Sequence, residues 1–478
     1  MTETGKPHNP GWVRERMMRQ FAELVRLSFP IVFQRLGIMT MGIVDTIMVG
    51  RYSAQELAYQ SIGYVPVSTL IVISIGLMMG TMVLTSNAFG AGEYEKCGRI
   101  WRRSVPYGFA LGMIGFVACI FGEPLLLLLG QAPDIARGGG IVMQAIAFGV
   151  PMTNVMLACT FFLEGVNRPL PGMIFIIIAN IINIFLNWIL VYGLLGFDPM
   201  GAEGSAWATT IVRTFLALGL ILYILNMKGH DIFAVRARVD MRLAQWKRLR
   251  HVGYASGLTN GAEHMGFATI EVFAGWIGPL TLGAMAIAFN IYGIPYMIAY
   301  GIAGATSVRV GIALGRRDHR DLLLAGSCGF LLNALIMLPL IWGLMTFPQP
   351  VASLFTTEAE LIAVTVPLVA LSAWMLLFDS LQTVIGNGLR GRRDVWPPTI
   401  LYFVSYLLVM IPLAYILAFP YGRGAVGLIE SIIVASLISC VLLMARFYYL
   451  SYRDFRAKSD QIEPLLFPDR HGDPKEKT

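Results

Sequence analysis

Long apolar runs recur along the whole chain and leave only short polar stretches between them. A helix needs about 20 apolar residues to cross the ~30 Å hydrocarbon core of a bilayer. About twelve runs are long enough, near residues 27–49, 62–85, 104–122, 141–163, 172–193, 205–226, 252–276, 283–308, 323–346, 361–387, 398–418 and 425–445. The pattern predicts an all-α polytopic membrane protein with twelve transmembrane helices.

The second half of the chain repeats part of the first half. A gap-free shift of 225 positions places Gly275, Leu282, Gly301, Thr306, Ala313 and Gly315 on Gly50, Leu57, Gly76, Thr81, Ala88 and Gly90. Weak internal symmetry of this kind is typical of transporters built from two related halves. Chance recurrence of small residues, in helices that are rich in them, is the alternative explanation.

The polar intervals divide the chain into five parts. They are an interfacial N-terminal segment (1–26), a first lobe (27–227), a basic linker (228–251), a second lobe (252–447) and a polar tail (448–478). If the N-terminus is cytoplasmic, the inner segments hold 31 of the 36 lysines and arginines and the outer loops hold 3. This bias predicts that both termini are cytoplasmic, and it explains the net charge of +7 without a nucleic-acid partner.

Composition excludes other classes of protein. The chain is 56% hydrophobic and 14% charged, with a mean hydropathy of +0.66, which is too apolar for a soluble domain. The sequence contains no HExxH motif and no GxSxG motif with a partner histidine. We therefore do not expect an enzyme.

Two carboxylates of the second half lie deep within apolar runs. Glu263 follows Arg250 by 13 residues and Asp379 precedes Arg390 by 11, distances of roughly 20 Å and 16 Å along a helix. An ionisable group at this depth is by default functional. His264 stands beside Glu263, but adjacent helical positions point about 100° apart, so a packing histidine is favoured over a proton relay.

A second polar group is expected in the first half. Asn180, Asn183 and Asn187 share one helical face, and Asp45, Asn187 and Thr209 each lie five or six residues from the outer end of their runs. A carboxylate, amides and a hydroxyl at one level suit a hard cation or a shared proton. The alternatives are an interfacial Asp45 paired with Arg51 and a purely structural seam of asparagines.

Several of these segments resemble one family of transporters. They are Gln34, VDTIMVG around Asp45, INIFLNW around Asn183 and Asn187, Glu263, SVRVGIALG, and FDSLQTVIGNGLRGRRD around Asp379. In this order and spacing they resemble the bacterial multidrug and toxic compound extrusion (MATE) family, NorM branch. The resemblance implies two pseudo-symmetric six-helix lobes around a central cavity that opens alternately to either side.

The resemblance also implies function. It implies a monomer in the bacterial inner membrane that exports cationic amphipathic drugs in exchange for Na⁺ or H⁺, with no cofactor besides the coupling ion. It assigns cation coupling to Glu263, Asp379 and Asp45, with Na⁺ possible at each of these carboxylates. The first-lobe site comprises Asp45, Asn180, Asn183, Asn187 and Thr209, and the substrate cavity comprises Gln34, Glu263 and Asp379.

A flippase for a lipid-linked precursor is the alternative from a related two-lobed family. Such a protein should line its cavity with arginines that hold a pyrophosphate. Only Arg35 and Arg213 fall within the predicted spans, whereas acidic groups lie at depth. This difference favours cationic substrates.

Overall fold

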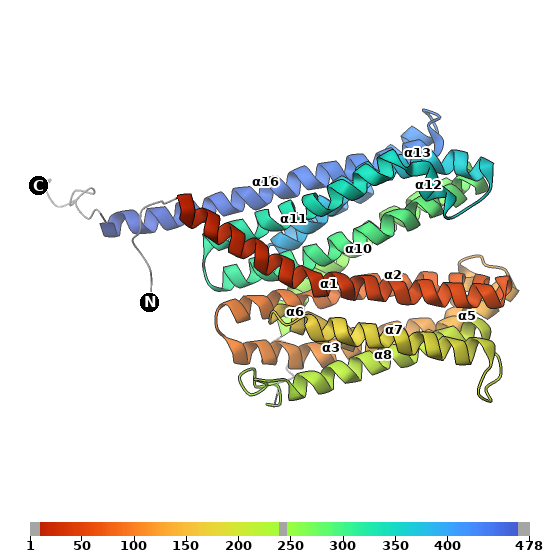
Figure 1. Cartoon of the computed structure of the whole chain (residues 1–478), viewed down its shortest axis with the longest axis horizontal. Helices are drawn as coiled ribbons and strands as arrows, with labels where there is room; N and C mark the ends of the chain where they lie inside the picture. The colour runs from red at the N-terminus through yellow and green to blue at the C-terminus, as the bar shows by residue number, and fades with distance from the viewer. Residues whose placement is uncertain (1–9, 239–245, 467–478) are drawn as a thin grey trace, which may run out of the picture.

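The first half of the chain is helical throughout in the computed structural model, which describes residues 10–238 and 246–466. Its helices are α1 (Pro10–Tyr52), α2 (Ala54–Gly90), α3 (Tyr94–Ile120), α4 (Gly122–Leu128), α5 (Pro133–Ala147), α6 (Gly149–Gly165), α7 (Leu170–Tyr192) and α8 (Gly201–Asn226). They form the N lobe, which is the lower half of the molecule in Figure 1.

The second half forms the C lobe. Its helices are α9 (Lys247–Ile277), α10 (Pro279–Gly315), α11 (His319–Thr346), α12 (Pro348–Ser353), α13 (Ala359–Gly391), α14 (Trp396–Phe403), the π-helical η2 (Val404–Met410), α15 (Ile411–Ala418) and α16 (Gly424–Leu466). The short helices α4 and α12 follow the third span of each lobe, so the two lobes share one plan.

The predicted number of spans is confirmed. Ten helical segments of the described chain are long and apolar enough to cross a membrane, and α5 and α6, bent by 43° at Phe148, form an eleventh. The twelfth is α9, which has 31 residues and is made less apolar by the polar residues around Glu263. The apolar run at 252–276 nevertheless identifies this helix, which carries a candidate site, in the sequence.

The internal repeat corresponds to structure. Helices α2 and α10 both have 37 residues, and their ends are 225 positions apart. A Cβ added to Gly90 would lie 2.1 Å from the carbonyl oxygen of Ile312, and one added to Gly315 would lie 2.1 Å from that of Asn87. The same shift interconverts these two contacts, so each lobe contributes one glycine to a pseudo-symmetric crossing of α2 and α10.

The lobes meet at the end of the molecule where both termini lie. We call this end the basic face; it carries Arg99, Arg248, Arg316, Arg393 and Arg446. Helix α2 packs on α9 and α1 packs on α10 across the interface. The lobes diverge toward the opposite end (Figure 1), so the conformation is closed at the basic face.

The predicted interfacial segment at residues 1–26 is corrected by the structure. Helix α1 runs without a break from Pro10 to Tyr52, and Arg16 forms ion pairs with Asp318 at 2.6 Å and Asp321 at 3.4 Å. Carboxylates at the start of α11 thus bind an arginine of the segment that was predicted to be interfacial. Helix α16 likewise continues past the predicted boundary at 447. Residues 1–9, 239–245 and 467–478, within the predicted terminal segments and linker, lie outside the described residues.

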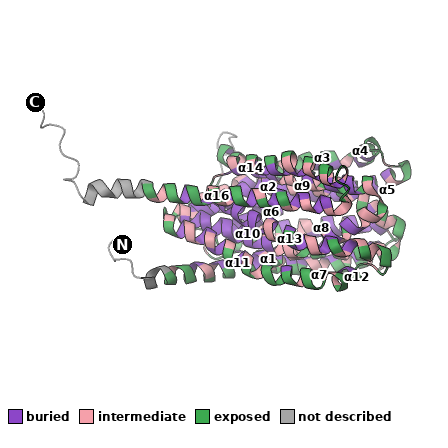
Figure 2. Cartoon of the chain, turned by 90° about the horizontal axis from the view of Figure 1, so that it is seen from above, coloured by how far each residue is buried: buried purple, intermediate pink, exposed green. Residues whose placement is uncertain are grey.

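The outer surface is apolar, as lipid contact requires. On α7, Ile177, Ile181 and Trp188 are exposed, whereas Asn183 and Asn187 on the opposite face are fully buried. Figure 2 shows buried residues along the interior of the bundle and exposed residues on its outside. Polar groups therefore face protein, the reverse of a soluble helix.

Candidate functional site

The N lobe holds a buried carboxylate between three helices. Asp45 on α1 is only 2% exposed. Its Oδ1 accepts a hydrogen bond from Asn187 Nδ2 at 2.7 Å, and its Oδ2 accepts one from Thr209 Oγ1 at 2.8 Å. Helices α7 and α8 pack on each other and on α1, so the three polar residues predicted at one level do meet. We call Asp45, Asn183, Asn187 and Thr209 the N-lobe site.

Oxygen atoms without partners mark this site. Neither the Nδ2 nor the Oδ1 atom of Asn183 has a hydrogen-bond partner among the described residues, and the same holds for Asn187 Oδ1. Both side chains are fully buried. A buried amide without partners is costly and calls for a bound water or ion as explanation. Amide, hydroxyl and carboxylate oxygens are ligands that hard cations prefer.

One alternative for Asp45 is excluded by its contacts. Its burial and its bonds to Asn187 and Thr209 rule out an interfacial aspartate that pairs with Arg51. The partly exposed Arg213 donates to the hydroxyl of Tyr64 at 3.3 Å, and no ion pair joins it to Asp45 within the described chain.

Asn180 forms its hydrogen bonds outside this group. Its Nδ2 donates to the backbone oxygens of Gly37 at 3.0 Å and Ile176 at 2.8 Å. The bond to Gly37 connects α7 to α1, while Asn180 Oδ1 is buried without a partner among the described residues. The assignment of Asn180 to the cation site stays a prediction.

The C lobe holds a second carboxylate with a fuller set of donors. Asp379 on α13 is completely buried. Its Oδ1 accepts from Tyr406 Oη at 2.7 Å, from Ser436 Oγ at 3.3 Å and from Gln382 Nε2, while Oδ2 accepts from Tyr292 Oη. A carboxylate offers about four lone-pair sites, so four donors occupy the acceptor capacity of Asp379. Asp45 accepts only two.

A π-helical turn places one of these donors. Tyr406 lies in the middle of η2, directly before α15 and its Pro412. Proline has no N–H to continue the α-helical ladder, and π-turns inside α-helices occur frequently at functional sites. The wider turn sets the height of Tyr406, which apolar patterning cannot reveal.

Stacked tyrosines connect Asp379 to Glu263. The rings of Tyr292 and Tyr296 stack with centroids 5.2 Å apart, and Tyr296 Oη donates to Glu263 Oε1 at 3.2 Å. Glu263 is half-buried. The structure thus brings together the two predicted carboxylates of the second half through residues that the sequence analysis did not single out. We call Glu263, Asp379, Tyr292, Tyr296 and Tyr406 the C-lobe site.

A buried ion pair was missed entirely. Arg35 Nη2 bonds both carboxylate oxygens of Glu164, at 2.9 and 3.2 Å, and its guanidinium lies 5.7 Å from the ring centre of Tyr300 on α10. The predicted span ended at residue 163, one position before Glu164. Arg35 on α1 was the signal available in the sequence for such an ion pair, because an arginine within the membrane requires a counter-charge.

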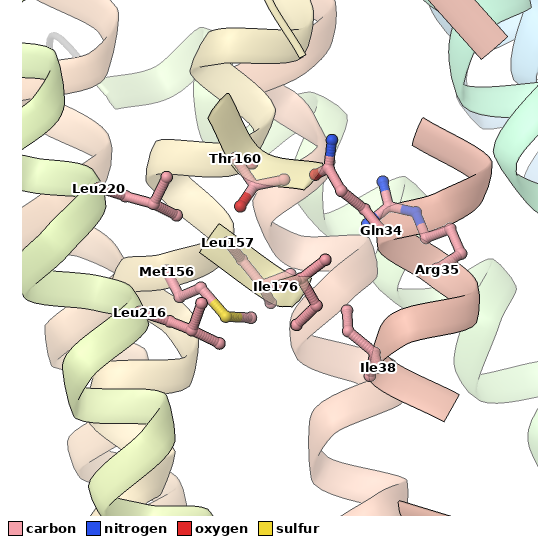
Figure 3. Close-up of a pocket in the computed structure, with 10 residues that line it drawn as sticks. Gln34, Arg35, Ile38, Met156, Leu157, Thr160, Ile176, Leu216 and Leu220 are labelled. Carbon is pink, nitrogen blue, oxygen red and sulfur yellow. The ribbon is translucent and has the colours of Figure 1, made fainter. Parts of the chain in front are cut away.

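Gln34 lies apart from the two carboxylates with which it was predicted to line a substrate cavity. Its Nε2 donates to the backbone oxygen of Pro169 at 2.9 Å. With Arg35, Ile38 and Thr160 it lines a small cavity of about 20 Å³ inside the N lobe (Figure 3). That volume holds about one water molecule, so this cavity is too small for a drug, and the assignment of Gln34 to a substrate cavity stays a prediction.

His264 has the packing role expected of it. Its Nε2 lies 3.1 Å from Thr69 Oγ1 on α2, which joins the two lobes near the middle of the membrane. No group of three or more His, Cys, Asp or Glu residues within the described chain could hold a metal.

Comparisons with known proteins agree with the fold and the repeat. The MatE family model matches residues 30–189 and again 255–416, which are the two halves found in the sequence. A probable multidrug resistance protein NorM of Caulobacter vibrioides is 36% identical, covering 94% of this chain and 95% of that protein. A probable multidrug resistance protein NorM of Bradyrhizobium diazoefficiens is 28% identical, covering 94% of this chain and 97% of that protein. The crystal structure of the eukaryotic MATE transporter AtDTX14 superposes with a TM-score of 0.83 at 19% identity, covering 92% of this chain and 99% of that one.

Proposed function

Because the chain belongs to the MatE family of membrane transporters, we propose that it is a multidrug efflux antiporter. It exports cationic amphipathic compounds by alternating access, in exchange for inward Na⁺ or H⁺. The observation that carries the proposal is one deeply buried aspartate in each lobe, Asp45 and Asp379, neither of which forms an ion pair with a described residue. A buried charge of this kind is compatible with folding when a cation or a proton binds to it.

The two sites differ in the ions that they suit. The N-lobe site has free carboxylate lone pairs and partnerless amide oxygens, an arrangement that suits Na⁺. The C-lobe site surrounds Asp379 with hydrogen-bond donors, and Na⁺ would have to displace them. We assign proton exchange and drug binding to Glu263 and Asp379.

The two kinds of ligand then compete for the same negative charges. The lobes reorient when a site is neutralised by a drug or by the coupling ion, so the exchange is obligatory. Exchange of one monovalent cationic drug for one Na⁺ or H⁺ moves no net charge, so the concentration gradient of the ion drives it. Each further elementary charge that moves inward gains ~2.3 kcal/mol per 100 mV, which corresponds to roughly fifty-fold in concentration.

We assign the basic face to the cytoplasm, because 31 of the 36 lysines and arginines lie in segments on that side. Both termini are then cytoplasmic, in the inner membrane of a bacterium. The closed basic face makes the present conformation outward-facing, and we expect the protein to work as a monomer.

The flippase alternative is not supported by the arginines of the predicted spans. Arg35 is paired with Glu164, and Arg213 donates to Tyr64. Of the other buried arginines, Arg309 pairs with Glu23, Arg392 pairs with Asp454, and Arg390 donates to Asn387. A pyrophosphate would require several arginines that converge on one cavity. The buried polar groups between the lobes instead favour a cation.

The test uses purified protein in liposomes, with a Na⁺ gradient and a pH gradient imposed separately. Wild-type protein should transport ethidium under at least one gradient. Under a gradient that drives wild-type transport, the transport should be abolished in each of the variants Glu263→Gln, Asp379→Asn and Asp45→Asn. Glu271→Gln is the matched control, because Glu271 is exposed on the same helix as Glu263. Normal gradient-driven transport in all three variants would refute the proposal.

A further inference from the structure

A cavity of about 310 Å³ opens at the basic face between the two lobes. The N lobe contributes Lys96, Arg99 and Arg103 from α3, and the C lobe contributes Arg248 from α9 and Arg393 from the loop after α13. None of the residues that line this cavity in the described part of the chain is acidic. We call it the interlobe basic cavity.

The positive charge of this cavity exceeds the counter-charge beside it. Glu93 forms an ion pair with Lys96 at 2.5 Å. Arg99, Arg248 and Arg393 form no ion pair with a described residue.

An apolar wall adjoins these cations. Trp246 is 8% exposed and lies edge-on against the ring of Tyr107, with centroids 5.9 Å apart. Leu84 and Leu249 line the same cavity. Cations beside apolar side chains, at the level where the helices leave the membrane, match the boundary between the headgroups and acyl chains of a lipid. A soluble phosphate would need no such wall.

We propose that the interlobe basic cavity binds the phosphate of an anionic phospholipid from the adjacent leaflet, with Arg99, Arg248 and Arg393 as its ligands. Arginine binds phosphate oxygens bidentately, and basic pockets between transmembrane helices hold lipid headgroups in this way. The volume lies at the lower end of the range for ligand pockets.

Binding has a conformational consequence, which rests on the proposed transport cycle. The arginines come from both lobes, so the cavity is complete only while the basic face is closed. A ligand that binds one conformation shifts the population toward that conformation. The lipid therefore stabilises the outward-facing state.

The experiment measures lipid retention by native mass spectrometry of the full-length protein. Dihexanoyl phosphatidylglycerol is titrated against wild type and against the Arg248→Gln, Arg393→Gln double variant. Both side chains are exposed, so the fold should be retained, and thermal unfolding without lipid checks this. Each arginine near an anionic headgroup contributes about fivefold in affinity, so the double variant should bind about thirty-fold more weakly.

The control has the same loss of charge elsewhere on the basic face. Arg453→Gln combined with Arg456→Gln removes two exposed charges from α16 and should leave phosphatidylglycerol affinity unchanged. Equal affinity in wild type and the cavity variant would overturn the proposal. Inorganic phosphate that bound as tightly as phosphatidylglycerol would overturn the assignment to a lipid, and dihexanoyl phosphatidylcholine should not bind.

A second readout separates this proposal from the proposed function. The probe is a single cysteine introduced at Ser307, which is buried at the basic-face end of the interface. In liposomes, replacing phosphatidylcholine by phosphatidylglycerol should slow labelling of this cysteine in the otherwise wild-type protein. The same replacement should not slow labelling in the cavity variant. This comparison requires no drug transport. A protein that failed to transport ethidium but bound phosphatidylglycerol through Arg248 and Arg393 would refute the function and retain the lipid site. Equal labelling in both lipids would overturn the conformational effect.

Discussion

The N-lobe and C-lobe sites each enclose one aspartate, but they treat it differently. Asp45 accepts two hydrogen bonds and lies beside amide groups that lack partners, whereas Asp379 accepts four. A carboxylate with spare lone pairs can bind a metal cation, whereas one whose lone pairs already accept hydrogen bonds must give up donors before it binds one. Related halves of one chain have thus acquired chemically distinct sites.

The largest predicted effect comes from exchanging the aspartates for asparagines one at a time. Asp379→Asn should weaken ethidium binding about a hundredfold, because the negative charge that we propose for binding a cationic drug is lost from a buried site. Asp45→Asn should leave ethidium binding nearly unchanged and abolish its response to Na⁺. Fluorescence titration of ethidium at two Na⁺ concentrations measures both quantities. If the two variants behaved alike, the distinction between the sites would be wrong.

The second prediction concerns the partnerless amide of Asn183. Asn183→Leu has a similar shape and removes two buried polar atoms without partners, so the free energy of unfolding should stay constant or rise by about 1 kcal/mol. Na⁺ affinity should fall about thirty-fold, because a ligand oxygen is lost. Isothermal titration with Na⁺ and thermal unfolding provide the two measurements.

This combination is diagnostic for Asn183. A structural asparagine would lose stability on replacement and would leave Na⁺ affinity alone. Ser256→Ala is the control. Ser256 Oγ is likewise buried without a described partner, but Ser256 is on α9, in the other lobe from Asp45. It should change neither quantity by more than the error of measurement.

Patterns that depend on depth and period were predictable from the sequence. Twelve spans, the shift of 225 residues and the common level of Asp45, Asn187 and Thr209 all follow from counting residues along regular helices. The ends of the helices were not predictable, because α1 and α16 continue past the apolar runs. Ion pairs such as that between Arg16 and Asp318 stabilise these extensions and leave no trace in hydropathy.

The donors around Asp379 were not predicted for a physical reason. Tyrosines are common in membrane helices, and only packing decides which of them turn inward. Tyr292 and Tyr296 are spaced by four residues in NIYGIPYMIAY, which was the available signal for one face. The height of Tyr406 depends on the π-turn, and Ser436 comes from α16, far along the chain. Asn180 and Gln34 show that polar side chains in a span also bond to the backbone of other segments.

The third prediction removes one donor from the C-lobe site. Tyr406→Phe deletes the 2.7 Å hydrogen bond to Asp379 Oδ1 and leaves three donors, so proton-driven efflux should fall about tenfold. Na⁺ affinity at the N-lobe site should not change. Tyr402→Phe is the control, because its hydroxyl donates to the backbone oxygen of Gln382 at 3.2 Å rather than to the carboxylate. A loss of equal size in both variants would indicate general damage to the helix.

The smallest predicted effect is that of His264→Gln, and it tests whether the C-lobe site needs a second titratable group. The ring of His264 contacts Thr69 of the opposite lobe, and glutamine can make a similar bond without titrating near neutral pH. Transport should therefore change less than about twofold, and its pH profile should keep its shape. A proton relay through His264 would instead move the alkaline or acid limb of that profile. Efflux is measured between pH 5 and 9 in wild type, His264→Gln and Thr69→Val. If the contact only joins the lobes, Thr69→Val weakens it, His264→Gln keeps it, and neither change shifts the limbs of the pH profile.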